Sequence, residues 1–238
     1  MANLQKGVLD KLDHFLKKQG FKYEVLISDD GSTDGSVEFT ESFTKDNSKF
    51  KLIKNSHLGK AGAVTSGMLK AKGEYVLFTD MDQATPIEEL CKLLPFADKY
   101  DIVIGSRSSQ RKGAPWTRVL MAKGMMILRR IIVGVKGISD TQCGFKLFRK
   151  DVSDNLFSKL QKFHHGYKAI SGSSVKAGFD VELLFLAQKM GYMIKEVPVE
   201  WLYVETRRVS PIKDSMEALE DLSIIRFNDI SGKYKVYE

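Results

Sequence analysis

The chain has 238 residues, of which 43% are hydrophobic and 28% charged, and this composition excludes a disordered or low-complexity protein. Its formal net charge of +7 indicates an anionic partner such as a nucleotide diphosphate, a lipid phosphate or a membrane surface, and no nucleic-acid-binding motif accompanies the basic residues. No run approaches the roughly 20 apolar residues needed to cross a bilayer, and Cys91 and Cys143 form no disulfide framework or metal-binding spacing and are expected to be buried.

Strands and helices alternate at short spacing through the first 105 residues, which predicts a mainly parallel sheet covered on both faces. A helix with one apolar face is expected from Leu4 to Lys18. Pro86 suits the first turn of another helix that runs to about Asp98. The other elements expected here are the strands Tyr23–Ser28, Phe50–Lys54, Tyr75–Thr79 and Asp101–Ile104, a helix opening near Thr33, and a helix over Lys60–Ala71.

The alternation becomes less regular after Gly105. A basic loop from Arg107 to Lys112 precedes a long helix from about Trp116 to Val133. Its broad apolar surface would suit a helix lying on an anionic membrane, or equally a core helix. That surface comprises Leu120, Met121, Met125, Ile127, Leu128, Ile131 and Ile132. The later elements expected are the strands Phe145–Phe148 and Met193–Trp201 and the helices Val152–Leu160, Phe179–Met190 and Pro211–Phe227.

Two of the predicted strands end in acidic residues. The strand that begins at Tyr23 leads into Asp29-Asp-Gly-Ser-Thr-Asp-Gly35, and the strand Tyr75–Thr79 leads into Asp80-Met-Asp82. Ligands of open α/β sheets bind at the carboxyl ends of the strands. Positions i and i+2 of an extended segment point to the same side, so Asp80 and Asp82 can converge on one divalent cation. The pattern predicts a metal–nucleotide site.

Each of these motifs also has a purely structural interpretation. The segment that begins with Asp29 and Asp30 could be an Asp-Gly turn followed by a helix, with Ser32 or Thr33 as its cap and Asp34 in its first turn. The segment Gly59-Lys-Ala-Gly62 could bind an anion at a helix N-terminus, or simply enter a tightly packed helix. Asp80 and Asp82 could belong to a solvated acidic turn. The residues alone leave these alternatives open.

Five motifs occur in an order that resembles family 2 of the glycosyltransferases, over about Lys6 to Phe227. They are similar to the branch that makes polyprenyl-phosphate sugars, which includes dolichyl-phosphate β-glucosyltransferases and dolichol-phosphate mannose synthases. The resemblance implies the α/β GT-A fold, a Rossmann-like sandwich with a mainly parallel mixed sheet. Family members open with a strand that this sequence is expected to lack. The motifs are Asp-Asp-Gly-Ser-Thr-Asp-Gly, Asp80-Met-Asp82, Ile104-Gly-Ser-Arg107, Asp140-Thr-Gln-Cys-Gly-Phe-Lys146 and Gly178-Phe-Asp-Val-Glu182.

The resemblance also implies how the chain is divided and which residues bind the donor. We expect one domain over residues 1–238, with a nucleotide-sugar-binding half at 4–105, an acceptor half at 106–210 and a C-terminal helix and tail at 211–238. Asp82 would ligate Mg²⁺ or Mn²⁺ directly, with Asp80 as a ribose or metal partner. The residues implied for nucleotide-sugar binding are Asp29, Asp30, Gly31, Ser32, Lys60 and Asp80.

On the acceptor side, the resemblance makes Asp140 and Gln142 catalytic residues together with Asp82. A phosphate acceptor is already an oxyanion near neutral pH, because its second pKa is about 6, and it needs no strong base. Asp140 would therefore orient groups or act electrostatically, and Gln142 would contact the sugar or the acceptor. Arginine matches phosphate with a planar donor fork. The candidates for holding the acceptor phosphate are Arg107, Arg118, Arg207 and Arg208.

These implications favour inverting transfer of a hexose to a polyprenyl or dolichyl phosphate at the cytosolic face of a membrane. Glucose from UDP-glucose is the first choice of donor, and GDP-mannose is the alternative. A second alternative is transfer to a saccharide hydroxyl, which would require a true base such as Asp140 or Glu182. The third is a truncated, non-catalytic nucleotide-binding relic.

Overall fold

The computed structural model describes residues 1–107, 124, 126–167, 178–202 and 211–235, with only the backbone described for 211–215. Most of the expected elements are present with boundaries shifted by a few residues. The helices are α1 (Ala2–Gln5), α2 (Val8–Lys17), α3 (Ser36–Asp46), α4 (Gly59–Lys70), α5 (Leu90–Leu93), α7 (Lys150–Phe163), α8 (Gly178–Lys189) and α9 (Pro211–Ile230). Residues 126–132 are also helical, and two 3-10 helices, η1 (Ile87–Glu89) and η2 (Leu94–Phe96), flank α5. The strands are β1 (Val25–Asp29), β2 (Phe50–Lys54), β3 (Tyr75–Thr79), β4 (Ile102–Ser106), β5 (Phe145–Arg149) and β6 (Ile194–Pro198).

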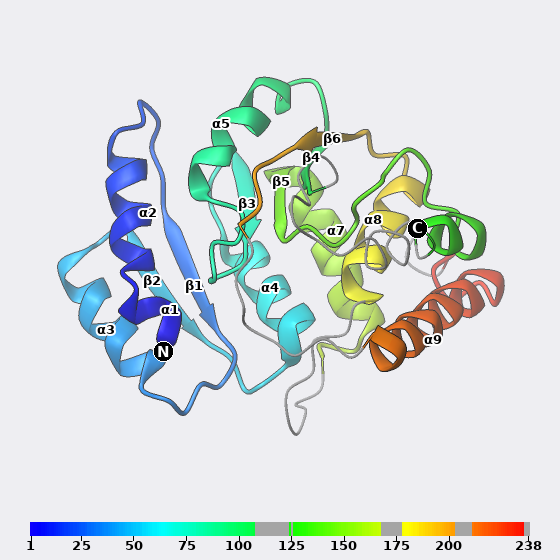
Figure 1. The fold of residues 1–238 in the computed structure, drawn as a ribbon, viewed down its shortest axis with the longest axis horizontal. Helices are drawn as coiled ribbons and strands as arrows, with labels where there is room; N and C mark the ends of the chain where they lie inside the picture. The colour runs from blue at the N-terminus through cyan, green and yellow to red at the C-terminus, as the bar shows by residue number, and fades with distance from the viewer. Residues whose placement is uncertain (108–123, 125, 168–177, 203–210, 236–238) are drawn as a thin grey trace.

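The described strands form two sheets (Figure 1). β1 and β2 pair in parallel, and the other four lie in the order β3-β5-β4-β6. In the larger sheet β5 runs antiparallel to β3 and β4, whereas β4 and β6 are parallel. β5 alone therefore opposes the other three strands. The predicted α/β fold with a mainly parallel mixed sheet is confirmed.

β1 and β3 are edge strands in the described part of the chain, although their apolar sequences are typical of buried central strands. β4 is buried at every position and β5 at four of its five. In contrast, β1 is fully buried only at Ile27, and β3 only at Val76 and Phe78. The two strands that carry the acidic motifs, β1 and β3, thus lie in different sheets.

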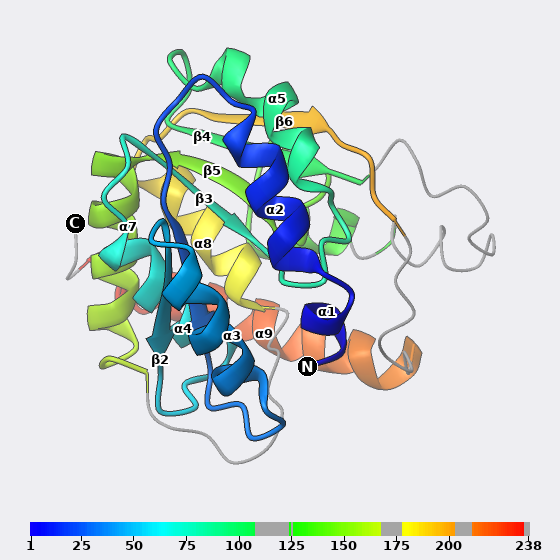
Figure 2. The same ribbon diagram turned by 90° about the vertical axis from the view of Figure 1, so that its left-hand side faces the viewer.

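Helices cover both faces of the strands (Figure 2). On one face, residues of α4, α7, α8 and α9 form one hydrophobic cluster with alternate residues of β4 and β5, including Ile102, Ile104 and Phe148. On the other face, leucines of α1, α2 and α5 belong to a second hydrophobic cluster together with Val103 and Leu147. The central strands β4 and β5 are therefore buried from both sides, as their near-continuous apolar runs predict.

Three expectations were wrong. The single helix from Leu4 to Lys18 is broken into α1 and α2, because Gly7 has a left-handed φ of 70°. The helix expected after Pro86 is divided into η1, α5 and η2; Pro86 precedes the first turn in an extended conformation, and Pro95 interrupts the last part. Cys91 is exposed, while Cys143 is buried as expected.

Candidate active site

A pocket of about 150 Å³ opens at the edge of the larger sheet where β3, β4 and β6 end. Because β5 is antiparallel to these strands, the loop that precedes it reaches the same edge. This topology gathers four of the predicted site residues in one pocket: Asp80, Asp82, Arg107 and Gln142. The other residues that line it are Thr79, Ala84, Thr85, Gly144 and Trp201. The predicted donor side and the predicted acceptor side therefore meet here.

Asp80 lies directly against the backbone of the loop before β5. Its N–H donates to the carbonyl of Gly144 at 3.2 Å. Its carboxylate occupies the space that a side chain at position 144 would need. Its Oδ1 lies 3.2 Å from Nζ of Lys60 at the start of α4. Lys60 and Asp80, which are both predicted to bind the nucleotide sugar, are thus in contact.

Asp82 belongs to a tight turn that follows β3. Its Oδ1 accepts a hydrogen bond from the N–H of Ala84 at 3.0 Å, and Gln83 between them has a left-handed φ of 50°. The described residues contain no group of three or more His, Cys, Asp and Glu that could hold a metal ion by themselves. Two carboxylates in a pocket nevertheless fit a cation of the Mg²⁺ type, which commonly takes one or two carboxylates from the protein and further oxygens from substrate phosphates.

Asp140 and Arg107 form a two-pronged ion pair at the other side of the pocket. Nε of Arg107 lies 2.7 Å from Oδ2 of Asp140, and its Nη2 lies 2.9 Å from Oδ1. The backbone N–H of Arg107 also donates to Oδ2. Burial disfavours the charge of Asp140, but the Arg107 guanidinium and its hydrogen bonds outweigh this and lower the carboxyl pKa to about 2. Asp140 is therefore ionised at neutral pH.

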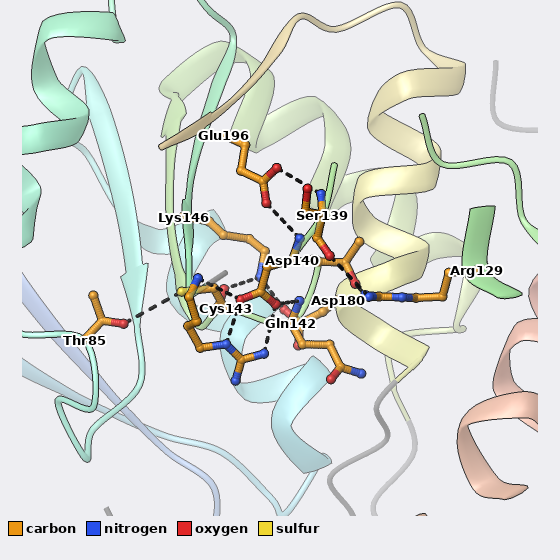
Figure 3. Close-up of polar contacts among 11 residues, drawn as sticks. Thr85, Arg129, Ser139, Asp140, Gln142, Cys143, Lys146, Asp180 and Glu196 are labelled. Atoms are coloured by element: carbon orange, nitrogen blue, oxygen red, sulfur yellow. Dashed lines mark hydrogen bonds and ion pairs between the residues drawn. The ribbon is translucent and has the colours of Figure 1, made fainter. Parts of the chain in front are cut away.

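The loop that carries Asp140 is fixed from neighbouring elements (Figure 3). Glu196 on β6 accepts hydrogen bonds from the backbone N–H groups of Ser139 and Asp140 at 2.9 and 2.7 Å. Arg129 donates to the hydroxyl of Thr141. The backbone N–H of Gln142 donates to Oδ1 of Asp140 at 3.2 Å, and the side chain of Gln142 is exposed. Sequence reasoning missed Glu196, which has no motif of its own.

Asp29 and Asp30 both accept hydrogen bonds from backbone N–H groups. Oδ1 and Oδ2 of Asp30 accept from the N–H groups of Leu58 and Gly59 at 2.6 and 2.8 Å, which caps the N-terminus of α4. Oδ2 of Asp29 accepts from the backbone N–H groups of Gly31 and Ser32. The Asp-Gly turn is present, but α3 begins only at Ser36 and Gly35 before it provides no side-chain cap, so the expected cap by Ser32 or Thr33 is wrong. A role of Asp29, Asp30, Gly31 and Ser32 in nucleotide binding stays a prediction.

Two further charged residues that no prediction singled out lie behind the pocket. Lys146 on β5 donates to Oδ1 of Asp180 on α8 at 2.7 Å, and Lys60 lies 3.7 Å from Oδ2 of the same carboxylate. Although burial opposes the charge of Lys60, the carboxylates of Asp180 and Asp80 raise its pKa above the ordinary value. Lys146 and Asp180 both belong to motifs quoted in the sequence analysis. Their contact could not be predicted, because they are far apart in the sequence and no local pattern links them.

Glu182, two residues further along α8, does not line the pocket. It is buried and accepts hydrogen bonds from the ring of His164 and the hydroxyl of Tyr234, both at 2.7 Å. Its position gives no support to a role as a general base. The predicted phosphate-binding residues Arg118, Arg207 and Arg208 lie outside the described residues.

Part of the predicted apolar helix surface lies within the described residues. Ile127, Leu128 and Ile131 are exposed, Ile131 at 73%, whereas Ile132 packs against the core. Leu120, Met121 and Met125 lie outside the described residues. In the described part of the chain, every helix is too short or too polar to span a membrane.

Residues 3–157 match the model of the family described as "Glycosyl transferase family 2". The dolichyl-phosphate β-glucosyltransferase of Dictyostelium discoideum is 32% identical over 97% of this chain and 72% of the relative. The Saccharomyces cerevisiae protein of the same name is 30% identical over 95% of this chain and 71% of its own. The human protein of that name is 30% identical over 96% and 72%.

Solved structures share the fold at much lower sequence identity. Mannosyl-3-phosphoglycerate synthase from Rubrobacter xylanophilus matches with a TM-score of 0.58 and 14% identity, over 95% of this chain and 70% of that chain. Glucosyl-3-phosphoglycerate synthase from Mycobacterium tuberculosis, in complex with Mn²⁺, UDP-glucose and glycerol 3-phosphate, matches with a TM-score of 0.51 and 14% identity, over 86% and 67%. At these identities the likeness concerns the fold alone.

Proposed function

The chain belongs to glycosyltransferase family 2, and from that premise we propose that it transfers glucose from UDP-glucose to dolichyl phosphate. It has the GT-A fold. Relatives that are about 30% identical over nearly the whole chain are named for glucosyl transfer to dolichyl phosphate. The observation that carries the proposal is that one pocket is lined by Asp80 and Asp82 together with Arg107 and Gln142.

In the reaction an oxygen of the lipid phosphate attacks C1 of the glucose. A new C1–O bond forms as the bond from C1 to the diphosphate breaks, and UDP leaves with the electron pair. Because the donor is an α-glycoside and the named product of the relatives is β, attack from the opposite face inverts C1. Mg²⁺ or Mn²⁺ bound by Asp80 and Asp82 would neutralise the charge that grows on the leaving diphosphate.

The protein's own cations have separate tasks in this proposal. Lys60 lies beside Asp80 and would contact the diphosphate, adding positive charge where negative charge develops. Arg107 would hold the attacking phosphate in line with C1. Asp140 keeps the Arg107 guanidinium in place by accepting two hydrogen bonds from it. Asp140 has a lowered pKa and is already satisfied by these bonds. It is therefore an orienting group rather than a proton acceptor, which suits an acceptor that is already ionised.

We also propose that the enzyme works at the cytosolic face of a membrane, where its lipid acceptor and a soluble nucleotide sugar can meet. The exposed side chains of Ile127, Leu128 and Ile131 accompany Arg130 on the same short helix. Apolar side chains flanked by basic residues suit contact with an anionic lipid surface. This supports the interfacial interpretation of that helix over the core interpretation.

A turnover assay tests the function directly. Purified protein would be given labelled UDP-glucose or GDP-mannose, a short dolichyl phosphate and Mn²⁺ or Mg²⁺. The expected product is dolichyl phosphate glucose, formed only from UDP-glucose. Product from GDP-mannose alone would replace the donor, and transfer to a free saccharide instead of the lipid would replace the acceptor class.

A further inference from the structure

A lysine is buried in the middle of the larger sheet. Lys146 on β5 has 0% exposure and pairs in register with Phe78 of β3 and Ile104 of β4. Its Nζ donates to the carbonyl of Cys143 at 2.6 Å and to Oδ1 of Asp180 at 2.7 Å. A buried ammonium is strongly unfavourable without a hydrogen-bonded counter-ion. Asp180, itself only 5% exposed, supplies that charge.

The same carboxylate reaches toward the pocket with its other oxygen. Oδ2 of Asp180 lies 3.7 Å from Nζ of Lys60, and Lys60 lies 3.2 Å from Asp80. Both ammonium groups also face the ring of Phe78, at 5.7 Å for Lys60 and 5.1 Å for Lys146. The four charged groups alternate in sign from the core to the pocket, in the order Lys146, Asp180, Lys60 and Asp80.

We propose that Asp180 is a positioning residue that holds Lys60 beside Asp80, where the donor diphosphate would bind, with Lys146 as the buried anchor that fixes Asp180. The inference rests on the proposed function, because it assigns Lys60 to the donor diphosphate. Asp180 itself touches no substrate and acts through Lys60.

The need for such a residue follows from the chemistry of Asp80. A divalent cation on Asp80 would compete with Lys60 for the same carboxylate oxygens. Of the two carboxylates that now face Lys60, only Asp180 would then remain available to it. A lysine side chain has a flexible four-carbon stem and loses considerable entropy when it is immobilised. Holding it before the ligand arrives removes part of that cost from binding.

A double-mutant cycle separates positioning from simple structural support. Asp180→Asn alone would leave Lys146 buried and charged beside a neutral amide, so this variant is expected to melt at a lower temperature. The informative variant combines Asp180→Asn with Lys146→Met, which removes both buried charges and keeps a side chain of similar length. Its affinity for UDP in the presence of Mn²⁺, measured by calorimetric titration, is expected to fall about tenfold, as for the loss of one charge-assisted contact.

The same pair of changes is then made in a Lys60→Met background. If Asp180 acts through Lys60, the pair should change UDP affinity by less than about twofold there, because coupled residues are not additive. A tenfold loss in both backgrounds would overturn the inference, since Asp180 would then act independently of Lys60. An affinity equal to that of the wild type in the original background would overturn it as well.

Asp229→Asn serves as the matched control. Asp229 pairs with Lys189 of α8 at 2.7 Å and lies away from the pocket residues. This variant removes the carboxylate partner of Lys189, which lies on α8 like Asp180. It is expected to bind UDP like the wild type. The two proposals can fail separately. Wild-type protein that binds no UDP would overturn both, whereas normal wild-type binding with an unchanged Asp180 variant would overturn only the positioning role.

Discussion

Gly144 and Asp80 are so close that a Cβ atom built on Gly144 would stand 1.8 Å from Oδ2 of Asp80. The carboxylate of Asp80 thus lies in the space that a larger residue would fill. The two residues come from different strands, at the end of β3 and before the start of β5, and antiparallel pairing brings them together. The glycine is therefore a requirement for the observed direction of a predicted metal-binding side chain.

Gly144→Ala should damage the site more than the fold. The new methyl group would force the Asp80 carboxylate to rotate away, while the backbone bond between the two residues can persist. We expect UDP affinity in the presence of Mn²⁺ to fall by at least about tenfold, the scale of one strong charged contact. Calorimetric titration measures the affinity, and a melting curve measures the fold.

Gly67→Ala in α4 is the control for this change. A Cβ there would meet the side chain of Ser28 at 3.6 Å, which is an ordinary contact. UDP affinity should be unchanged in that variant. Normal UDP affinity in Gly144→Ala would show that Asp80 can take another rotamer without loss of binding, and the metal-ligand assignment of Asp80 would be abandoned.

Asp140 should make stability depend on pH in acid. Its pKa is lowered in the folded protein to about 2, from an ordinary value of 3.8. A depressed folded pKa stabilises the protein fully above the unfolded pKa, and this stabilisation is lost as pH falls through the folded pKa. The free energy of unfolding should therefore decline by about 2 kcal/mol between pH 5 and pH 2 on account of this residue.

Chemical denaturation at several pH values, for wild type and Asp140→Asn, measures this contribution. The variant should be less stable at pH 6, and the difference between the two proteins should shrink as the pH approaches 2. A difference that stays constant across this range would mean that the ion pair with Arg107 does not set the carboxyl pKa.

Arg107→Lys should weaken the acceptor side and spare the donor side. Lysine keeps the positive charge but loses the planar fork that meets both oxygens of Asp140. We expect the apparent affinity for dolichyl phosphate to fall about tenfold to a hundredfold, because a charge-assisted contact is worth roughly 1.5–3 kcal/mol. Steady-state kinetics with varied acceptor, together with titration of UDP, gives both quantities.

The same assay applies to Arg118→Ala and to Arg207→Ala combined with Arg208→Ala. Equal losses of donor binding and transfer in these variants would reassign the arginines to the nucleotide diphosphate. Transfer that is unchanged in all of them would remove the lipid-phosphate assignment.

Ile131→Glu should reduce membrane contact without affecting folding. Ile131 is 73% exposed, so a charged residue there meets water and should leave the melting temperature nearly unchanged. Facing lipid, the same charge would be unfavourable. We expect less of the variant to sediment with vesicles that contain anionic lipid, and Ile127→Glu should behave in the same way. Equal sedimentation of both variants and the wild type would place the membrane contact elsewhere.

Regular elements followed from local patterns in the sequence, and contacts between distant elements did not. The strands Phe50–Lys54 and Tyr75–Thr79 have the predicted bounds, because short apolar runs between turn residues specify buried strands. The break at Gly7 was missed because a glycine within a helical pattern is usually tolerated.

The candidate site shows the same division. The spacing of Asp80 and Asp82 predicts that their side chains point to the same side, and both line the pocket. The use of Asp30 as a cap for α4 and the contact of Lys146 with Asp180 join residues that are 28 and 34 positions apart. Such contacts depend on how β1, α4, β5 and α8 pack, which no local pattern encodes.

The first turn of α4 spans the division between the two sheets. Asp30 at the end of β1 binds the backbone at Leu58 and Gly59, and the next residue, Lys60, binds Asp80 at the end of β3. Among the described strands, β1 and β3 are not hydrogen-bonded to each other. The first turn of α4 therefore connects the two acidic motifs through its contacts with Asp30 and Asp80. The separation of the two acidic motifs therefore depends on about one turn of helix, and a shift of β1 relative to β3 would displace Lys60.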